Sequence, residues 1–109
     1  MNKYQLLSAR TLNGLQVKPI EAELRLVNMV LGLAGESGEI ADMVKKTVYH
    51  KHELDLGELV DELGDLLWYV AAICTLFNID MDKVMERNIE KLKARYPEGF
   101  TFEDNINRQ

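Results

Sequence analysis

The sequence predicts an all-α protein, built as an antiparallel bundle of about four helices. Apolar residues recur at steps of three and four through most of the chain, which is the spacing of one face of a helix. The two prolines, Pro19 and Pro97, lie toward the ends, and the chain between them has no β-type alternation. We therefore expect the second, third and fourth helices to form one bundle, with a short first helix packed beside it.

The first two helices are bounded by turn-forming residues. A helix from Lys3 to about Leu12 is expected to end at the pair Asn13-Gly14. Pro19 suits the first turn of a second helix, which we expect to run to about Val48. Because a glycine inside a helix costs about 1 kcal/mol relative to alanine, Gly35 is the position at which this helix would break.

The third and fourth helices begin at residues that can cap them. Asp55, with Glu58 three residues later, resembles a capping box, and Asn78 is expected to end the third helix. The fourth helix is expected to begin at Asp80 or Met81 and to stop before the second proline. The polar tail that follows residue 100 is expected to be partly mobile.

Length and composition restrict the class of protein. The 109 residues predict one domain, spanning 1–109 with its motifs between about 25 and 102, and the net charge of −5 disfavours general binding of nucleic acid polymers. The N-terminus does not resemble a signal peptide, and no apolar run approaches the ~20 residues of a membrane span. A cytoplasmic protein without a membrane partner is therefore expected. The single cysteine, Cys74, cannot form a disulfide within the chain and is expected in the core.

Two pairs of acidic residues form the candidate site. Glu36 and Glu39 are three residues apart in the second predicted helix, and Glu62 and Asp65 repeat this spacing in the third. The first member of each pair lies three residues after a leucine, on the apolar stripe. One such pair is common on a solvated face, but two pairs with this placement are not. Antiparallel packing of the two helices would bring the pairs face to face.

Four carboxylates in one partly buried place repel each other unless several are protonated or cations lie among them. A set of oxygen ligands suits Mg²⁺ or Mn²⁺, and the absence of histidine from both pairs disfavours zinc. The Glu-x-x-His pairs of di-iron bundles, the calcium-loop pattern and the ending of a phosphate-binding P-loop are also missing. Close approach between the helices, or to a ligand, would explain the glycines near the pairs, which are Gly32, Gly35, Gly38 and Gly64.

A basic line on the predicted fourth helix consists of Arg87, Lys91 and Arg95, with Asn88 beside it. The ordinary interpretation is a solvated face. The functional interpretation is a phosphate clamp opposite the acidic pairs, because metal ions together with lysine and arginine neutralise a polyphosphate. Trp68 and Tyr69 follow the second acidic pair and either stack on a nucleotide base or pack in the core, and for Tyr69 we favour the core.

Three blocks, in this order, resemble the MazG-like, all-α nucleoside triphosphate pyrophosphohydrolases: LGLAGESGEIADMVKK, DELGDLLWYV and ERNIEKLKARYPEGF. The resemblance covers most of residues 31–100. The first block of that family often has two adjacent acids, and here Gly35 takes the place of one, which leaves the four ligand positions intact. The resemblance implies Mg²⁺-dependent hydrolysis of a nucleoside or deoxynucleoside triphosphate to the monophosphate and pyrophosphate.

The resemblance also implies roles for individual residues. The metal ligands would be Glu36, Glu39, Glu62 and Asp65, and the contacts to substrate phosphates would be Lys91 and Arg95, with Asn88 as a further contact. Glu39 is our candidate for the carboxylate that deprotonates the attacking water. A homodimer or homotetramer is expected, because members of the family usually associate and a chain this small gains from shared burial.

Two other functions remain open at this point. The chain is alternatively a non-catalytic helical dimer that binds a nucleotide or protein partner, with a purely structural acidic cluster. A related pyrophosphatase acting on a non-nucleotide diphosphate is the other alternative. A panel of triphosphates incubated with Mg²⁺ distinguishes these functions by the products.

Overall fold

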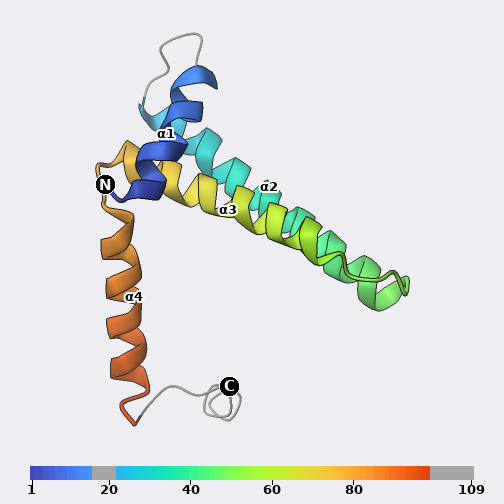
Figure 1. Cartoon of the computed structure of the whole chain (residues 1–109). Helices are drawn as coiled ribbons and strands as arrows, with labels where there is room; N and C mark the ends of the chain where they lie inside the picture. The colour runs from blue at the N-terminus through green and yellow to red at the C-terminus, as the bar shows by residue number, and fades with distance from the viewer. Residues whose placement is uncertain (16–21, 99–109) are drawn as a thin grey trace.

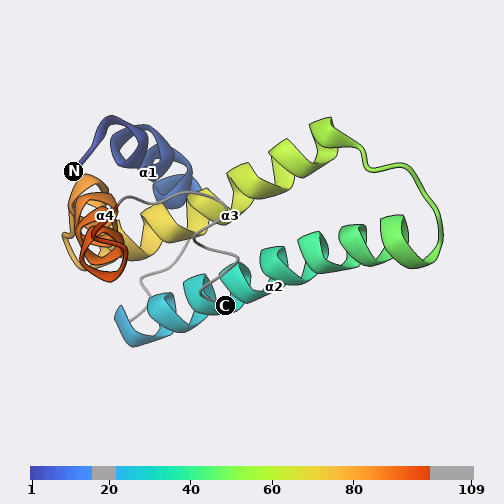
Figure 2. The same ribbon diagram turned by 90° about the horizontal axis from the view of Figure 1, so that it is seen from below.

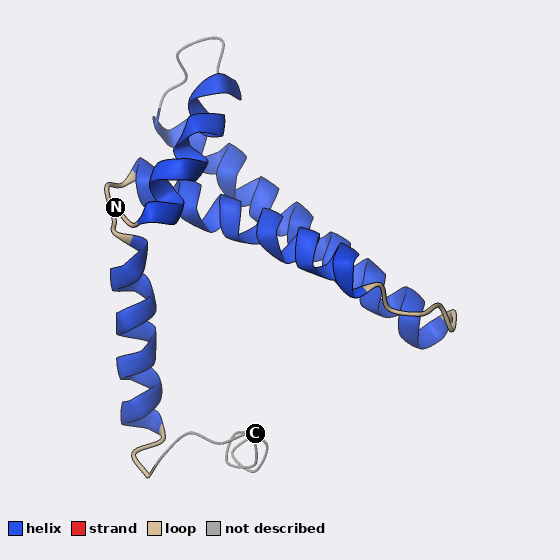
Figure 3. Ribbon diagram, viewed as in Figure 1, coloured by secondary structure: helices blue, strands red, loops and turns tan. Residues whose placement is uncertain are grey.

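The computed structural model describes residues 1–15 and 22–98, and these form four helices with no strand among them (Figures 1 and 3). The helices are α1 (Lys3–Leu15), α2 (Ala22–Tyr49), α3 (Leu56–Leu76) and α4 (Met81–Arg95). The predicted all-α class with about four helices is confirmed. Pro19 and the tail after residue 100 lie outside the described residues.

A long hairpin of α2 and α3 is the main structural unit (Figure 2). The two helices run antiparallel and side by side, as predicted. The helix α2 continues through Gly35 without a break. Its inward stripe, which includes Met29, Leu33, Ile40 and Met43, is buried or half-buried. Burial of that stripe offsets the cost of an internal glycine, because tertiary packing outweighs helix propensity.

The ends of α3 agree with the sequence expectations. Asp55 is its N-cap, and the Asp55 Oδ1 atom accepts a hydrogen bond of 3.1 Å from the backbone N–H of Glu58. The helix ends at Leu76, and Asn78 then adopts a left-handed conformation with φ of 56°. The first helix is longer than predicted, since α1 continues through Asn13 and Gly14 to Leu15.

Gln5 joins α1 to the turn between α3 and α4. Its side chain is fully buried, although it is polar. The Oε1 atom accepts hydrogen bonds from the backbone N–H of Met81 at 2.7 Å and from that of Asn2 at 3.1 Å. The Nε2 atom donates to the carbonyl of Ile79 at 2.9 Å. Gln5 therefore holds the first residue of α4 and the preceding turn in a fixed relation to α1.

The fourth helix points away from the hairpin, which differs from the predicted packing of the second to fourth helices in one bundle (Figure 1). Packing between helices is made by α2 with α3 and by α1 with α3, while α4 touches other helices only marginally. The apolar side chains of Val84, Met85 and Ile89 on α4 are about half exposed. The radius of gyration is 17.2 Å, whereas a compact domain of this size has about 13 Å. Among the described residues, α4 therefore has no extensive packing against another helix.

The buried core of the described residues is small. Its apolar members are Met29, Ala71, Ala72, Cys74, Met81 and Tyr96. The burial of Cys74 is as predicted. None of the described helices combines the length and the apolar character required to cross a bilayer.

Candidate metal centre

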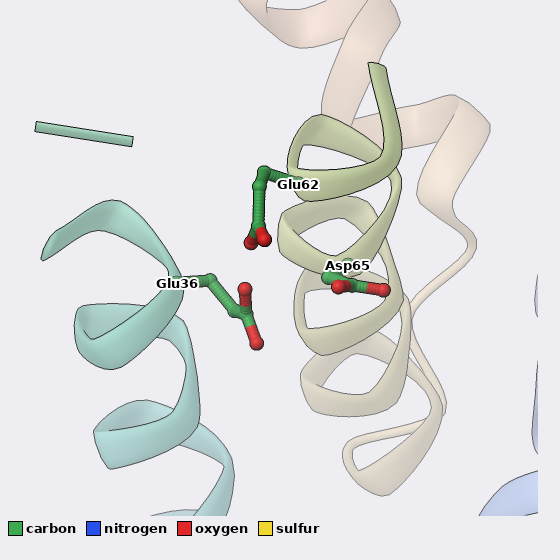
Figure 4. A group of neighbouring side chains, drawn as sticks. All are labelled: Glu36, Glu62 and Asp65. Atoms are coloured by element: carbon green, nitrogen blue, oxygen red, sulfur yellow. The ribbon is translucent and has the colours of Figure 1, made fainter. Parts of the chain in front are cut away.

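Three of the four predicted acidic ligands meet between α2 and α3. Glu36 comes from α2, and Glu62 and Asp65 come from α3. Each offers one carboxylate oxygen, and these three atoms lie within 4.8 Å of one another. Figure 4 shows Glu36 and Glu62 reaching toward each other across the space between the helices, with Asp65 one turn further along α3. We call these three residues the carboxylate trio.

The trio has the charge of a cation site, and two of its three members are half-buried. The Oε2 atoms of Glu36 and Glu62 are both buried and receive no hydrogen bond from a donor group. The pKa of Glu62 is raised by its interaction with the Glu36 carboxyl, by partial desolvation, and by the negative charges of Glu36 and Asp65, while its interaction with Glu39 acts in the opposite direction. Two carboxylates at this separation require either a shared proton or a cation. The donor set, all oxygen, fits a hard divalent ion such as Mg²⁺ or Mn²⁺.

Glu39 lies beside the trio, in contact with Glu62 but outside the group whose oxygens converge. The pKa of Glu39 is raised, first by a hydrogen bond with Glu62, then by the negative charge of Glu62, by burial and by Asp65. Its side chain is exposed to solvent. The geometry therefore distinguishes Glu39 from the other three acids, which the sequence spacing did not.

In the part of the chain that the structure describes, a cavity adjoins the acidic residues on either side along the hairpin. The larger, of about 600 Å³, lies toward the connection at residues 50–55, and both Glu39 and Glu62 line it. The smaller, of about 350 Å³, lies toward α1, and Glu36 and Asp65 line it together with Thr11, Trp68 and Tyr69. The carboxylates thus separate a polar cavity from one with two aromatic walls.

The first helix contributes to this site, which the sequence analysis did not anticipate. Thr11 of α1 lines the smaller cavity, and its Oγ1 atom accepts a hydrogen bond of 2.8 Å from the indole Nε1–H of Trp68. Tyr4 lies close enough to Asp65 that the negative charge, in addition to burial, raises the pKa of the phenol. Tyr4 and Thr11 are seven residues apart and so lie on one face of a helix. This spacing is the feature of the sequence from which a contribution of α1 to the site could have been predicted.

The glycines have different roles from one another. A Cβ atom at Gly32 would overlap the ring of Tyr69, so close approach explains this glycine. A Cβ atom at Gly35, Gly38 or Gly64 would meet no atom within 4 Å. The prediction of close approach between helices is therefore correct for Gly32 and wrong for these three. Gly35 and Gly38 line the larger cavity, where approach of a ligand remains a prediction.

The predicted phosphate contacts lie on α4. Asn88, Lys91 and Arg95 are exposed there, and α4 points away from the hairpin that holds the trio. Within one chain the basic line therefore does not face the acidic pairs.

The fold and the site together define a class: an all-α hairpin domain with an acidic site between its two long helices. The sequence matches the MazG nucleotide pyrophosphohydrolase domain over residues 25–100, so the chain belongs to that family. The matched range includes all four acids and the whole of α4.

The chain is also similar to the Gene 37 protein of Mycobacterium phage L5, with 37% identity over 75 residues. This match covers 65% of the present chain and 66% of the phage protein. No solved structure matches the chain significantly.

Proposed function

We propose that this protein hydrolyses a nucleoside or deoxynucleoside triphosphate to the monophosphate and pyrophosphate, in the cytoplasm and with Mg²⁺ or Mn²⁺. Membership of the MazG nucleotide pyrophosphohydrolase family supports the reaction class. The single observation that carries the proposal is the carboxylate trio, with its two buried oxygens that receive no hydrogen bond. A hairpin whose acidic residues are merely structural requires neither the convergence of the three carboxylates nor the two buried oxygens.

Glu36, Glu62 and Asp65 would hold the metal, with Glu39 as the fourth acidic residue in reach of it. When bound, Mg²⁺ neutralises phosphate charge and acts as a Lewis acid on the phosphoryl group. The carboxylates contribute fixed orientation, since they come from two packed helices and need little rearrangement.

Glu39 is our candidate general base. It is exposed at the cavity of about 600 Å³ and lies beside Glu62, so it borders the trio while remaining accessible to water. A raised pKa makes a carboxylate a better proton acceptor near neutral pH. Glu39 would orient the attacking water and take its proton, while the trio positions the triphosphate.

Lys91 and Arg95, with Asn88, would bind the phosphates from a second copy of the chain. Because α4 points away from its own hairpin and exposes apolar side chains, a homodimer or homotetramer would cover those side chains. The distribution of charged residues also favours association of α4 with the hairpin of a second copy. The helix α3 carries four acidic and no basic residues, whereas α4 carries five basic and three acidic residues.

The test is a panel of ribo- and deoxynucleoside triphosphates incubated with Mg²⁺, with identification of the products. We expect a nucleoside monophosphate and pyrophosphate, and no reaction in the presence of a chelator. Glu62→Gln should abolish turnover, whereas Asp61→Asn, a neighbouring exposed acid on α3, should not. Absence of product from every triphosphate, with folded protein, would favour the non-catalytic dimer. Cleavage of a non-nucleotide diphosphate alone would favour the other pyrophosphatase.

A further inference from the structure

The smaller cavity on the α1 side of the trio has walls that are held in place by two separate contacts. The Trp68 indole is fixed by its hydrogen bond of 2.8 Å to Thr11 of α1. The Tyr69 ring is fixed by its position against the backbone of Gly32 on α2. The two rings meet edge to face, with centroids 5.0 Å apart and an interplanar angle of 86°. Three helices thus build one rigid aromatic corner.

The lining of this cavity suits a planar, uncharged ring joined to a phosphate group. Both aromatic side chains are only partly buried, so they offer surface to a ligand. Glu36 and Asp65 also line the cavity, and both belong to the trio. A ligand that fills the cavity therefore has its aromatic part against Trp68 and Tyr69 and its other end beside the metal ligands.

The indole N–H of Trp68 and the hydroxyl of Thr11 are already engaged. The Thr11 hydroxyl accepts from Trp68 and donates to the carbonyl of Ser8 at 2.7 Å, and the indole N–H is used in the first of these bonds. These groups contribute rigidity instead of hydrogen bonds to the ligand. The ring faces of Trp68 and Tyr69 can stack on a base, and such stacking suits any base because every base has a π-face.

We propose that this cavity binds the nucleobase and sugar of the substrate, with Trp68 and Tyr69 as binding residues and Thr11 and Gly32 as positioning residues. The inference rests on the proposed function, and it sets the direction of the substrate. The nucleoside lies on the α1 side of the trio, and the pyrophosphate lies on the side of the larger cavity. The helix α1, which is outside the matched family range, is then part of the substrate site.

The two halves of a deoxynucleoside triphosphate give a direct test, because Trp68 is the only tryptophan in the chain. With Mg²⁺ present, dAMP, dCMP, dGMP and dTMP are titrated against the intrinsic fluorescence of the full chain, and inorganic pyrophosphate is titrated separately. We expect saturable quenching by at least one monophosphate and none by pyrophosphate. No quenching by any monophosphate, or equal quenching by pyrophosphate, would overturn the proposal.

Two variants with matched controls test the positioning residues, with binding measured by calorimetry. Thr11→Val removes the acceptor for the indole, and we expect the Kd of the monophosphate to rise about fivefold or more while that of pyrophosphate is unchanged. Its control is Ser8→Ala, because the Ser8 hydroxyl, like that of Thr11, donates to a backbone carbonyl of α1 but has no bond to Trp68.

Gly32→Ala displaces the Tyr69 ring, and we expect a rise of about tenfold or more in the same Kd. Gly64→Ala is its control, because a Cβ there meets nothing within 4 Å. If Gly32→Ala does not fold, the Thr11→Val comparison decides. Unchanged monophosphate affinity in Thr11→Val would refute its positioning role.

The outcomes separate this proposal from the function on which it rests. Hydrolysis of a triphosphate by the wild-type protein, without quenching of Trp68 by its monophosphate, would refute the nucleoside cavity and leave the reaction intact. Quenching by monophosphates with no hydrolysis of any triphosphate would support the cavity and refute the reaction.

Discussion

Glu36 and Glu62 face each other across the α2–α3 hairpin, and each has one buried carboxylate oxygen that accepts no hydrogen bond. The arrangement is unfavourable for two charged groups unless a proton or cation joins them. Stability should therefore depend on divalent ions and on pH, and both dependences can be measured without knowledge of the substrate.

Divalent ions should stabilise the folded protein through the trio. A ligand that binds only the folded state at 100 times its Kd adds about 2.7 kcal/mol to the free energy of unfolding. We expect Mg²⁺ or Mn²⁺ to raise the melting temperature of the wild type. Glu36→Gln should abolish most of that rise, and Asp61→Asn should retain it. An equal rise in Glu36→Gln, measured by differential scanning calorimetry, would place the ion elsewhere.

The metal-free protein should lose stability as the pH rises. Glu39 and Glu62 have pKa values raised above the ordinary 4.5, so the folded state binds more protons than the unfolded state between the ordinary and the raised pKa. The free energy of unfolding then falls as pH increases through that interval and stays low above it. Urea denaturation in a chelator at a series of pH values measures this effect. Saturating Mg²⁺ should reduce the slope, and a metal-free slope of the opposite sign would contradict the prediction.

Sites shared between copies should be restored by mixing two inactive variants. Glu62→Gln retains an intact α4, and Lys91→Ala retains intact acidic pairs. If α4 acts on the neighbouring chain, co-expressed mixed dimers have one complete site of two, so about a quarter of wild-type turnover should return at equal expression. Each variant alone is the control. Failure to recover turnover, with mixed dimers demonstrated by mass spectrometry, would place Lys91 and Glu62 of one chain in the same site.

Loss of Gln5 should destabilise the junction from which α4 leaves. Gln5→Ala leaves the N–H of Met81 and the carbonyl of Ile79 without their side-chain partner. An unsatisfied buried polar group costs about 1–3 kcal/mol, so we expect a loss of about 2–4 kcal/mol in the free energy of unfolding. Arg10→Ala, an exposed change on the same helix, should have little effect in the same urea titration. A loss as small as that of the control would show that Gln5 does not hold the junction.

Much of the local structure was predictable from the sequence, because it depends on neighbours along the chain. The cap at Asp55 and the end of α3 near Asn78 follow from side chains that bond within a few residues. Helical spacing also placed Glu36, Glu62 and Asp65 on facing stripes, and these three do converge. The fourth acid, Glu39, has the same spacing, but its contact with Glu62 depends on the distance between the helices.

The contribution of α1 and the direction of α4 were not predictable in this way. Thr11 and Trp68 are 57 residues apart, and Gln5 and Met81 are 76 residues apart. No periodicity within a helix specifies such pairs. The close approach of Gly32 to Tyr69 likewise depends on how α2 packs on α3, and the neighbouring glycines at 35 and 38 show that the residue type alone does not indicate it.

The sequence by itself determined the helices, their caps and the acidic faces, since backbone hydrogen bonds and apolar periodicity act over a few residues. Tertiary structure alone decided which carboxylates converge, which aromatic rings border them, and that α4 leaves the hairpin. These features arise from contacts between residues distant in sequence, such as the hydrogen bonds of the buried Gln5 side chain with Ile79 and Met81 at the start of α4.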